Sequence, residues 1–202
     1  MKSWLLRFIF VIFLVFSPLP TILSAQGRTG HLTLIILVDK SLSMRPYFQQ
    51  VKNFLLNKVL GEWLKTGDSV ALFTFYGTAH LKLWDSPLDA NEKPQLRQII
   101  SEIQADGRFT DIGNALDTYE NWAKTAILPP WRRLVLLLTD LRQEAPPNSP
   151  YQFPNFTIQH PLLKGARIIS HGQWKAITVD TVNSSTLDKL MDKLSPLFSP
   201  QS

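Results

Sequence analysis

The 202-residue chain contains no cysteine. It can therefore form neither a disulfide framework nor a thiolate metal site, and it has no thiol that could act as a nucleophile. Its four histidines, at positions 31, 80, 160 and 171, share no spacing motif, which argues against a histidine-based metal or catalytic site. Candidate metal ligands are therefore sought among the oxygen-bearing side chains.

Basic residues form no run and no nucleic-acid recognition motif, although the formal net charge is +5. Two of the 21 Lys and Arg residues, Lys2 and Arg7, lie in a segment expected to be removed, which leaves 19 − 16 = +3. A charge this small and this scattered argues against a nucleic-acid partner.

Residues 1–25 have the features of a signal peptide. A basic start is followed by the apolar run Phe8–Phe16, which Pro18 and Pro20 end, and small residues precede Gln26. The run is well short of the ~20 apolar residues that a membrane-spanning helix needs. We expect cleavage near Gln26 and an exported protein, periplasmic or extracellular. An uncleaved membrane anchor remains the alternative.

The rest of the chain alternates strand and helix patterns and is expected to form one domain over residues 26–198, with a short tail at 199–202. Strands are predicted at 32–38, 70–76, 79–84 and 133–139, helices at 48–59, 96–103, 112–123 and 187–194, and a hairpin at 166–170 and 174–179. Residues 141–165 are predicted to form a proline-rich loop. This order predicts a three-layer α/β/α fold with a mostly parallel, doubly wound sheet and one short antiparallel edge strand at 79–84.

An oxygen-rich segment follows the first strand. Asp39, Ser41 and Ser43 alternate after seven almost continuously apolar residues, so their side chains can gather on one side. Such a set suits a hard cation like Mg²⁺, and open α/β sheets place ligands at the carboxyl ends of their strands. At a strand end in a polar loop, Asp39 is expected to contribute little to the core.

Three segments carry oxygen-bearing side chains at corresponding places: the apolar strand followed by Asp39-x-Ser41-x-Ser43, the glycine-threonine loop that carries Thr110, and an apolar strand that ends in Thr139-Asp140. Together they resemble the metal-ion-dependent adhesion site of the von Willebrand factor type A family. The resemblance covers roughly residues 31–194. It implies the type A fold, with strands and helices arranged as predicted above.

The resemblance also implies a site and a function. Ser41 and Ser43 would bind Mg²⁺ or Mn²⁺ directly, Thr110 would bind when a ligand is present, and Asp39 and Asp140 would act mostly through water. The cation would then complete its coordination with an acidic residue of a partner protein. We therefore expect a non-enzymatic, cation-dependent protein-binding or adhesion module.

Several residues near these ligands would form a partner-binding rim. The cations Lys40, Arg45, Arg108 and Arg142 all lie within a few positions of a proposed ligand, and Phe109 adjoins Thr110. Their summed charge predicts an acidic partner surface or peptide.

Other interpretations stay open. The family's usual glycine after Thr-Asp is Leu141 here, so the domain could be a scaffold with a degenerate metal site. Ser41 and Ser43 could instead cap the following helix, and Asp111 is expected to be a helix cap. A phosphatase of haloacid-dehalogenase type is less favoured, because it needs a second aspartate where Ser41 stands.

Overall fold

The computed structural model describes residues 28, 30–89, 91–152, 158 and 160–180. The predicted signal peptide, the helix predicted at 187–194 and the tail lie outside these residues. None of the described helices is both long enough and apolar enough to cross a membrane.

A six-stranded sheet forms the centre of the domain, in the order β3-β2-β1-β4-β6-β5. The strands are β1 (Leu32–Asp39), β2 (Ser69–Phe75), β3 (Ala79–Asp85), β4 (Arg132–Thr139), β5 (Arg167–His171) and β6 (Trp174–Asp180). β1 pairs in parallel with β2 on one side and with β4 on the other. The carboxyl ends of these three strands therefore meet at one edge of the sheet.

The α/β fold is confirmed, but the prediction of a single antiparallel strand is wrong. β3 pairs antiparallel with β2 as predicted, and the predicted hairpin β5–β6 also joins the sheet, where β6 pairs antiparallel with β4. A parallel return to the sheet needs a crossover, usually a helix. In its described residues, the connection from β4 to β5 has only the 3₁₀ turn Pro161–Leu163, so the chain returns as a hairpin through Gly172.

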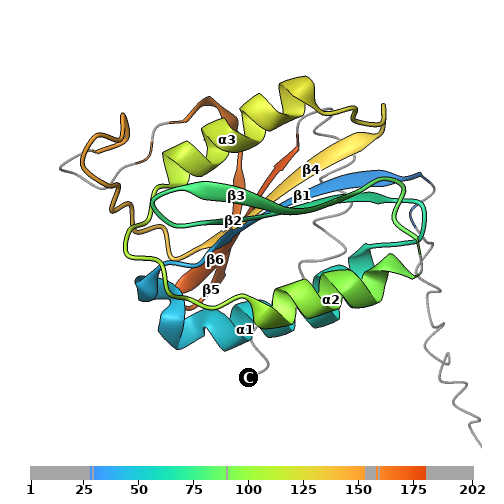
Figure 1. The fold of residues 1–202 in the computed structure, drawn as a ribbon, viewed down its shortest axis with the longest axis horizontal. Helices are drawn as coiled ribbons and strands as arrows, with labels where there is room; N and C mark the ends of the chain where they lie inside the picture. The colour runs from blue at the N-terminus through green and yellow to red at the C-terminus, as the bar shows by residue number, and fades with distance from the viewer. Residues whose placement is uncertain (1–27, 29, 90, 153–157, 159, 181–202) are drawn as a thin grey trace, which may run out of the picture.

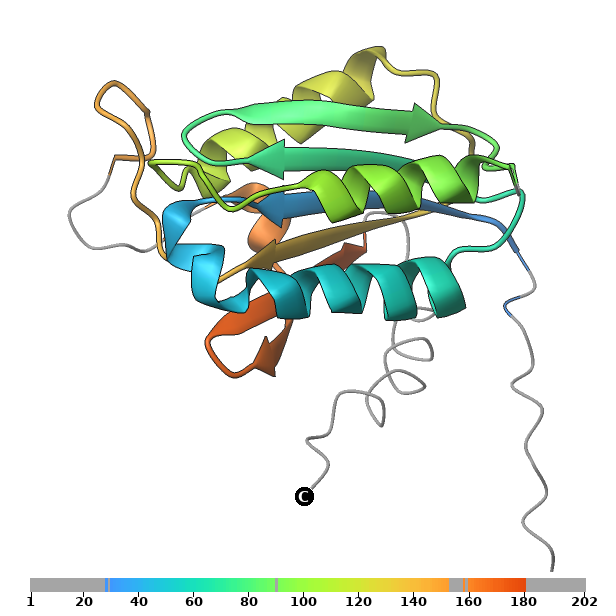
Figure 2. The same cartoon turned by 60° about the horizontal axis from the view of Figure 1, so that its bottom comes forward.

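Helices cover both faces of the sheet (Figure 1). One continuous helical stretch begins as a 3₁₀ turn and ends as a π-helix: η1 (Leu42–Tyr47), α1 (Phe48–Asn53) and η2 (Phe54–Trp63). This stretch and α2 (Glu92–Glu102) lie on one face, and α3 (Ile112–Thr125) lies on the other (Figure 2). The predicted three-layer arrangement is therefore present.

The two cores explain why β1 is almost entirely apolar. All eight of its residues are buried. Leu34, Ile36 and Val38 pack into the core beneath α1, η2 and α2, whereas Ile35 and Leu37 pack into the core beneath α3. A strand covered on both faces needs apolar side chains in both directions, as the sequence pattern predicts.

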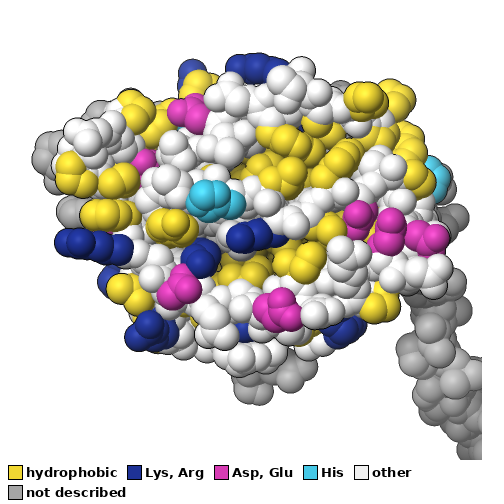
Figure 3. Space-filling model, in the orientation of Figure 1, with side chains coloured by type: hydrophobic (Ala, Val, Ile, Leu, Met, Phe, Trp, Pro, Cys, Tyr) yellow, Lys and Arg dark blue, Asp and Glu magenta, His cyan; other side chains and the backbone are white. Residues whose placement is uncertain are grey.

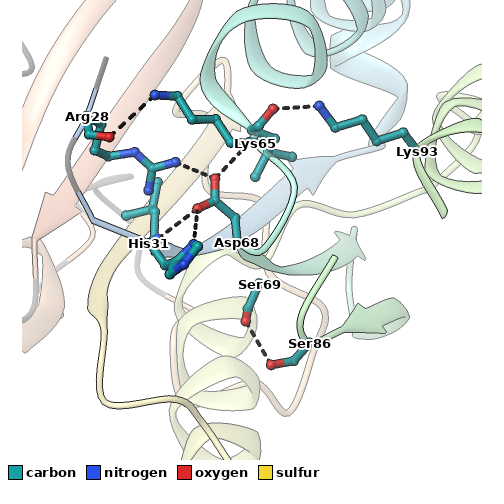
Figure 4. Close-up of polar contacts among 9 residues, drawn as sticks. Arg28, His31, Lys65, Asp68, Ser69, Ser86 and Lys93 are labelled. Carbon is teal, nitrogen blue, oxygen red and sulfur yellow. Dashed lines mark hydrogen bonds and ion pairs between the residues drawn. The ribbon is translucent and has the colours of Figure 1, made fainter. Parts of the chain in front are cut away.

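A buried carboxylate joins the amino ends of the central strands (Figure 4). Asp68 precedes β2, is fully buried, and forms an ion pair with Arg28. Its Oδ1 accepts a hydrogen bond from the backbone N–H of Leu32 (3.0 Å) and its Oδ2 accepts one from that of Lys65 (2.9 Å). Asp68 thus ties the start of β1 to the turn before β2, at the end opposite to the candidate site.

Candidate metal centre

Asp39 ends β1 with its side chain fully buried. Its Oδ1 accepts a hydrogen bond from the Ser41 backbone N–H (2.9 Å), and its Oδ2 accepts one from the Thr139 hydroxyl at the end of β4 (2.7 Å). The expectation that Asp39 lies in a polar loop is therefore wrong, because its side chain is buried at the end of a strand. The Thr-Asp motif includes Thr139, but the contact of Thr139 with Asp39 depends on the pairing of β1 with β4.

Ser41 and Ser43 face each other, with their Oγ atoms 3.0 Å apart. Ser41 is buried and Ser43 is half-buried. Although Ser41 occupies the N-cap position of η1, its side chain makes no capping hydrogen bond. The capping interpretation of Ser41 is therefore not supported, and its hydroxyl is directed to the other serine.

The glycine-threonine loop, which contains Gly107 and Thr110, lies beside the loop that contains Ser41 and Ser43; we call the latter the serine loop. Gly107 donates to the carbonyl oxygen of Lys40 (3.0 Å) and accepts from the Leu42 backbone N–H (2.8 Å). A Cβ at Gly107 would overlap the side chain of Tyr76, so this close approach requires glycine. The backbone pairing thus fixes the loop of Thr110 beside Ser41.

Thr110 is buried, and its backbone pairs with the segment that follows β4. Its N–H donates to the Glu144 carbonyl oxygen (3.0 Å), and the Glu144 N–H donates back to its carbonyl oxygen (2.8 Å). The next residue, Asp111, accepts from the Asn114 N–H (3.0 Å) and caps α3, which confirms the predicted capping role.

Asp140 has a buried carboxylate of which only one oxygen accepts a hydrogen bond. Its side chain is only 3% exposed. Oδ1 accepts from the Arg142 backbone N–H (3.0 Å), but Oδ2 is buried and makes no hydrogen bond. Oδ2 forms a long ion pair with Arg142 Nε (3.7 Å), and the Arg142 side chain is 63% exposed.

Leu141 adopts a left-handed conformation, with φ of 65°. Glycine favours this region because it lacks a Cβ, whereas other residues pay on the order of 1–2 kcal/mol for it. Leu141 is half-buried and packs against the core beneath α3, which offsets part of this cost. The departure from the family's glycine therefore leaves the backbone in a conformation that glycine readily takes.

Burial raises the pKa of the Asp39 carboxyl from 3.8 to about 7. Hydrogen bonds from Ser41 and Thr139 lower it, and the negative charge of Asp140 raises it further. Two buried carboxylates with only neutral donors around Asp39 make an environment that a divalent cation would neutralise. The all-oxygen set of Ser41, Ser43, Thr110, Asp39 and Asp140 fits Mg²⁺ or Mn²⁺.

The predicted rim residues differ in their solvent exposure and in whether their charge is paired. Lys40 pairs with Asp106 (2.6 Å) and lies over the ring of Tyr76, so its charge is largely compensated. Arg45 and Arg142 are exposed. Figure 3 shows several basic side chains at the end of the molecule that carries these loops.

The two remaining rim residues lie against each other. The guanidinium of Arg108 lies 5.3 Å from the ring centre of Phe109. Phe109 is half-buried and lies close to Gly77. Arg108 and Phe109 are therefore accessible to solvent on the loop that carries Thr110.

Comparison with known proteins identifies the family. A family model of the von Willebrand factor type A domain matches residues 34–143, which is more than half of the chain. The chain belongs to the von Willebrand factor type A family. An uncharacterized protein of Treponema pallidum (strain Nichols) is 28% identical to this type A domain over 160 residues, 78% of this chain and 72% of that protein.

Two solved structures show partial similarity. Proximal thread matrix protein 1 from the mussel byssus was solved with zinc in its metal-ion-dependent adhesion site (MIDAS) motif. It is 23% identical to this chain at a TM-score of 0.39, and the match covers 50% of this chain and 26% of that chain. An aerotolerance-related membrane protein from Bacteroides fragilis is 22% identical at a TM-score of 0.43, over 58% of this chain and 57% of that one. The type A domain thus spans from about a quarter to just over half of these chains.

A second group of possible ligands lies along α3. Asp117, Glu120 and His160 approach within 4.8 Å of one another. His160 Nδ1 accepts a hydrogen bond from the Leu162 backbone N–H (3.2 Å), and its Nε2 lies 3.2 Å from Asp117 Oδ1. Both ring nitrogens therefore take part in hydrogen bonds, and the group connects α3 to the segment at His160.

The raised pKa of Asp39 predicts how stability depends on pH when a chelator is present. The unfolded carboxyl ionises near 3.8, but the folded one keeps its proton up to about 7. The folded state should therefore lose stability as the pH rises from about 4 to above 7. One pKa unit corresponds to about 1.4 kcal/mol, so the total loss is at most on the order of 4 kcal/mol. Urea unfolding in EDTA at pH 5 and pH 8 would measure the larger part of this loss.

Asp39→Asn is the informative variant, because it keeps the side-chain size and removes the titration. We expect it to lose most of this pH dependence and to be at least as stable as the parent at pH 8. Asp106→Asn, at a carboxylate that is 58% exposed, should keep the parent's dependence. If the parent and Asp39→Asn showed equal pH dependence of stability, the loss of stability could not come from the raised pKa of Asp39.

Proposed function

We propose that this type A domain is a divalent-cation-dependent protein-binding module. The ion, Mg²⁺ or Mn²⁺, would be held by the hydroxyl oxygens of Ser41 and Ser43, and also by that of Thr110 when a partner's carboxylate is bound, with Asp39 and Asp140 acting mostly through water. The observation that carries the proposal is the buried Asp140 Oδ2, which makes no hydrogen bond at an edge of the sheet where hydroxyl oxygens from a neighbouring loop gather.

The chemistry of the donor set explains why such an ion would bind a partner. Hydroxyl ligands add no charge, and carboxylates that act through water neutralise the ion only partly. When bound, the cation would supply positive charge and a free coordination position for an acidic side chain of another protein. We assign no catalytic step to the domain, because Ser41 stands where a haloacid-dehalogenase-type phosphatase needs an aspartate.

A scaffold with a degenerate metal site is the second candidate, and its main support was Leu141. The left-handed φ of Leu141 weakens that support, because the loop keeps a turn that glycine would take. The contacts of Asp39 with both Ser41 and Thr139 also keep the serine loop next to β4. We therefore favour a functional metal site.

Titration with Mn²⁺ tests the metal directly. Calorimetry on the EDTA-treated, dialysed protein at pH 8 should show one site, and Asp39→Asn should weaken the affinity at least tenfold because the buried negative charge is gone. Asp106→Asn, which removes the exposed carboxylate that pairs with Lys40, should change the affinity less than threefold. A parent protein with no Mn²⁺ site would support the degenerate scaffold.

The rim supports an acidic partner. Arg45, Arg108 and Arg142 are exposed around the site and raise the local positive field, although Glu144 is exposed as well. Lys40 contributes less than its position in the sequence suggests, because it is paired with Asp106. Opposite charge mainly speeds the encounter between partners, so the three arginines should act on the association rate.

Peptides selected from a random library on the Mg²⁺-loaded domain should carry Asp or Glu and should be released by EDTA. Replacing the three arginines together by Gln should slow peptide association several-fold at low salt and leave Mn²⁺ affinity nearly unchanged. The matched control is Lys164→Gln, an exposed cation far along the chain from the three loops. Selected peptides that lack acidic residues, or that bind equally well in EDTA, would refute an acidic partner.

We also propose that residues 1–25 are removed during export, so that the domain acts in the periplasm or outside the cell. The support is the short apolar run before Pro18 and Pro20. Amino-terminal sequencing of the protein from its native source should start near Gln26. A membrane-bound product that starts at Met1 or Lys2 would favour an anchor.

A further inference from the structure

Gln143 lies three residues after Asp140 and is almost fully buried, with 2% of its surface exposed. Its Oε1 accepts a hydrogen bond from the Ile112 backbone N–H (2.9 Å). Its Nε2 donates to Asp111 Oδ1 (3.1 Å) and to the Tyr151 carbonyl oxygen (3.3 Å). One side chain therefore connects the segment after β4 to the two residues that follow Thr110.

The path of the chain shows how Gln143 reaches this position. The left-handed conformation of Leu141 turns the backbone after Asp140, and the Glu144 backbone then pairs with Thr110 in both directions. The loops of Asp140 and Thr110 are thus joined by two backbone hydrogen bonds and by the amide of Gln143.

Neighbouring residues complete this connection. The Asp111 carboxylate also accepts from the Ser149 hydroxyl, and the ring of Tyr151 lies against Gly113, where a Cβ would overlap it. The Tyr151 hydroxyl donates to Asp117 Oδ2 (2.9 Å). The loop from Gln143 to Tyr151 is therefore attached to the first two turns of α3, close to Thr110.

The amide group of Gln143 suits this role because it offers both an acceptor and two donors. Glutamate at this position would lack the donors and would place a negative charge beside Asp111. Methionine has a similar size but would leave the Ile112 N–H without its acceptor and Asp111 without one of its donors. The three partners of Gln143 are the N-cap Asp111, the first residue of α3, Ile112, and Tyr151, so the side chain joins the segment after β4 to the start of α3 directly behind Thr110.

We propose that Gln143 is a positioning residue that holds Thr110 at a fixed distance from Asp140 and so preorganises the metal site. The inference rests on the proposed metal-binding function. A cation with strict coordination geometry binds weakly where one ligand must first be ordered, because ordering a backbone segment costs free energy. Gln143 does not itself contact the ion, and its effect passes through Thr110.

A double-mutant cycle tests this. Gln143→Met should lower Mn²⁺ affinity at least tenfold in calorimetry with acetate present to supply the partner's carboxylate, the condition in which Thr110 is expected to bind the ion, and Thr110→Val should lower it as well. If Gln143 acts through Thr110, adding Gln143→Met to Thr110→Val should cost less than a further threefold. Ile100→Val, in the core beneath α2, is the control for general destabilisation and should leave Mn²⁺ affinity unchanged.

Ser149→Ala provides a second, milder variant in case Gln143→Met does not fold. It removes one hydrogen bond to Asp111, and we expect a two- to fivefold loss of affinity that also disappears in the Thr110→Val background. Unfolding in EDTA would confirm that each variant is folded.

The outcomes separate the two proposals. If the parent binds no Mn²⁺, the proposed function itself fails. If the parent binds Mn²⁺ but the Gln143 and Ser149 variants bind it equally tightly, the positioning role fails while the metal site stands. Equal losses with and without Thr110→Val would also overturn the inference, because Gln143 would then act by another route.

Discussion

The buried carboxylate of Asp39 is the constraint on which the functional end of this domain depends. It ends a strand covered on both faces, and it is satisfied only by neutral donors from Ser41 and Thr139. An isolated buried charge is costly, so its pKa rises unless a cation lies nearby. The surrounding loops gather oxygen atoms around this carboxylate, which is the arrangement that a hard divalent cation would stabilise.

The unfavourable backbone conformation of Leu141 lies in the segment that pairs with the loop of Thr110. Its left-handed backbone is unfavourable for a leucine, yet the turn carries the chain back onto the loop of Thr110. The half-buried side chain packs against the core beneath α3 and recovers part of the free energy. A change from glycine that looks damaging in the sequence is therefore compatible with the same path of the chain.

The hydrophobic patterns allowed most elements to be predicted, because each pattern reflects a local geometry. The strand at Leu32–Asp39, the helix at Ile112–Thr125 and the hairpin through Gly172 were expected from the spacing of apolar residues and turn residues. The antiparallel entry of β6 was missed, since apolar alternation does not reveal direction. The compensation of Lys40 by Asp106 was also missed, because the two residues are far apart in the chain.

The sequence by itself determined the three segments that carry the candidate ligands, because an apolar strand that ends in Asp39 or in Thr139-Asp140, and a glycine-threonine loop before a helix, are local signals. Only the tertiary structure decided that Asp39 is fully buried and that Gln143 joins two loops. The physical reason is that burial and hydrogen-bond partners depend on which segments pack together. Parallel pairing of β1 with β4 brings residues 39 and 139 into contact across a hundred positions.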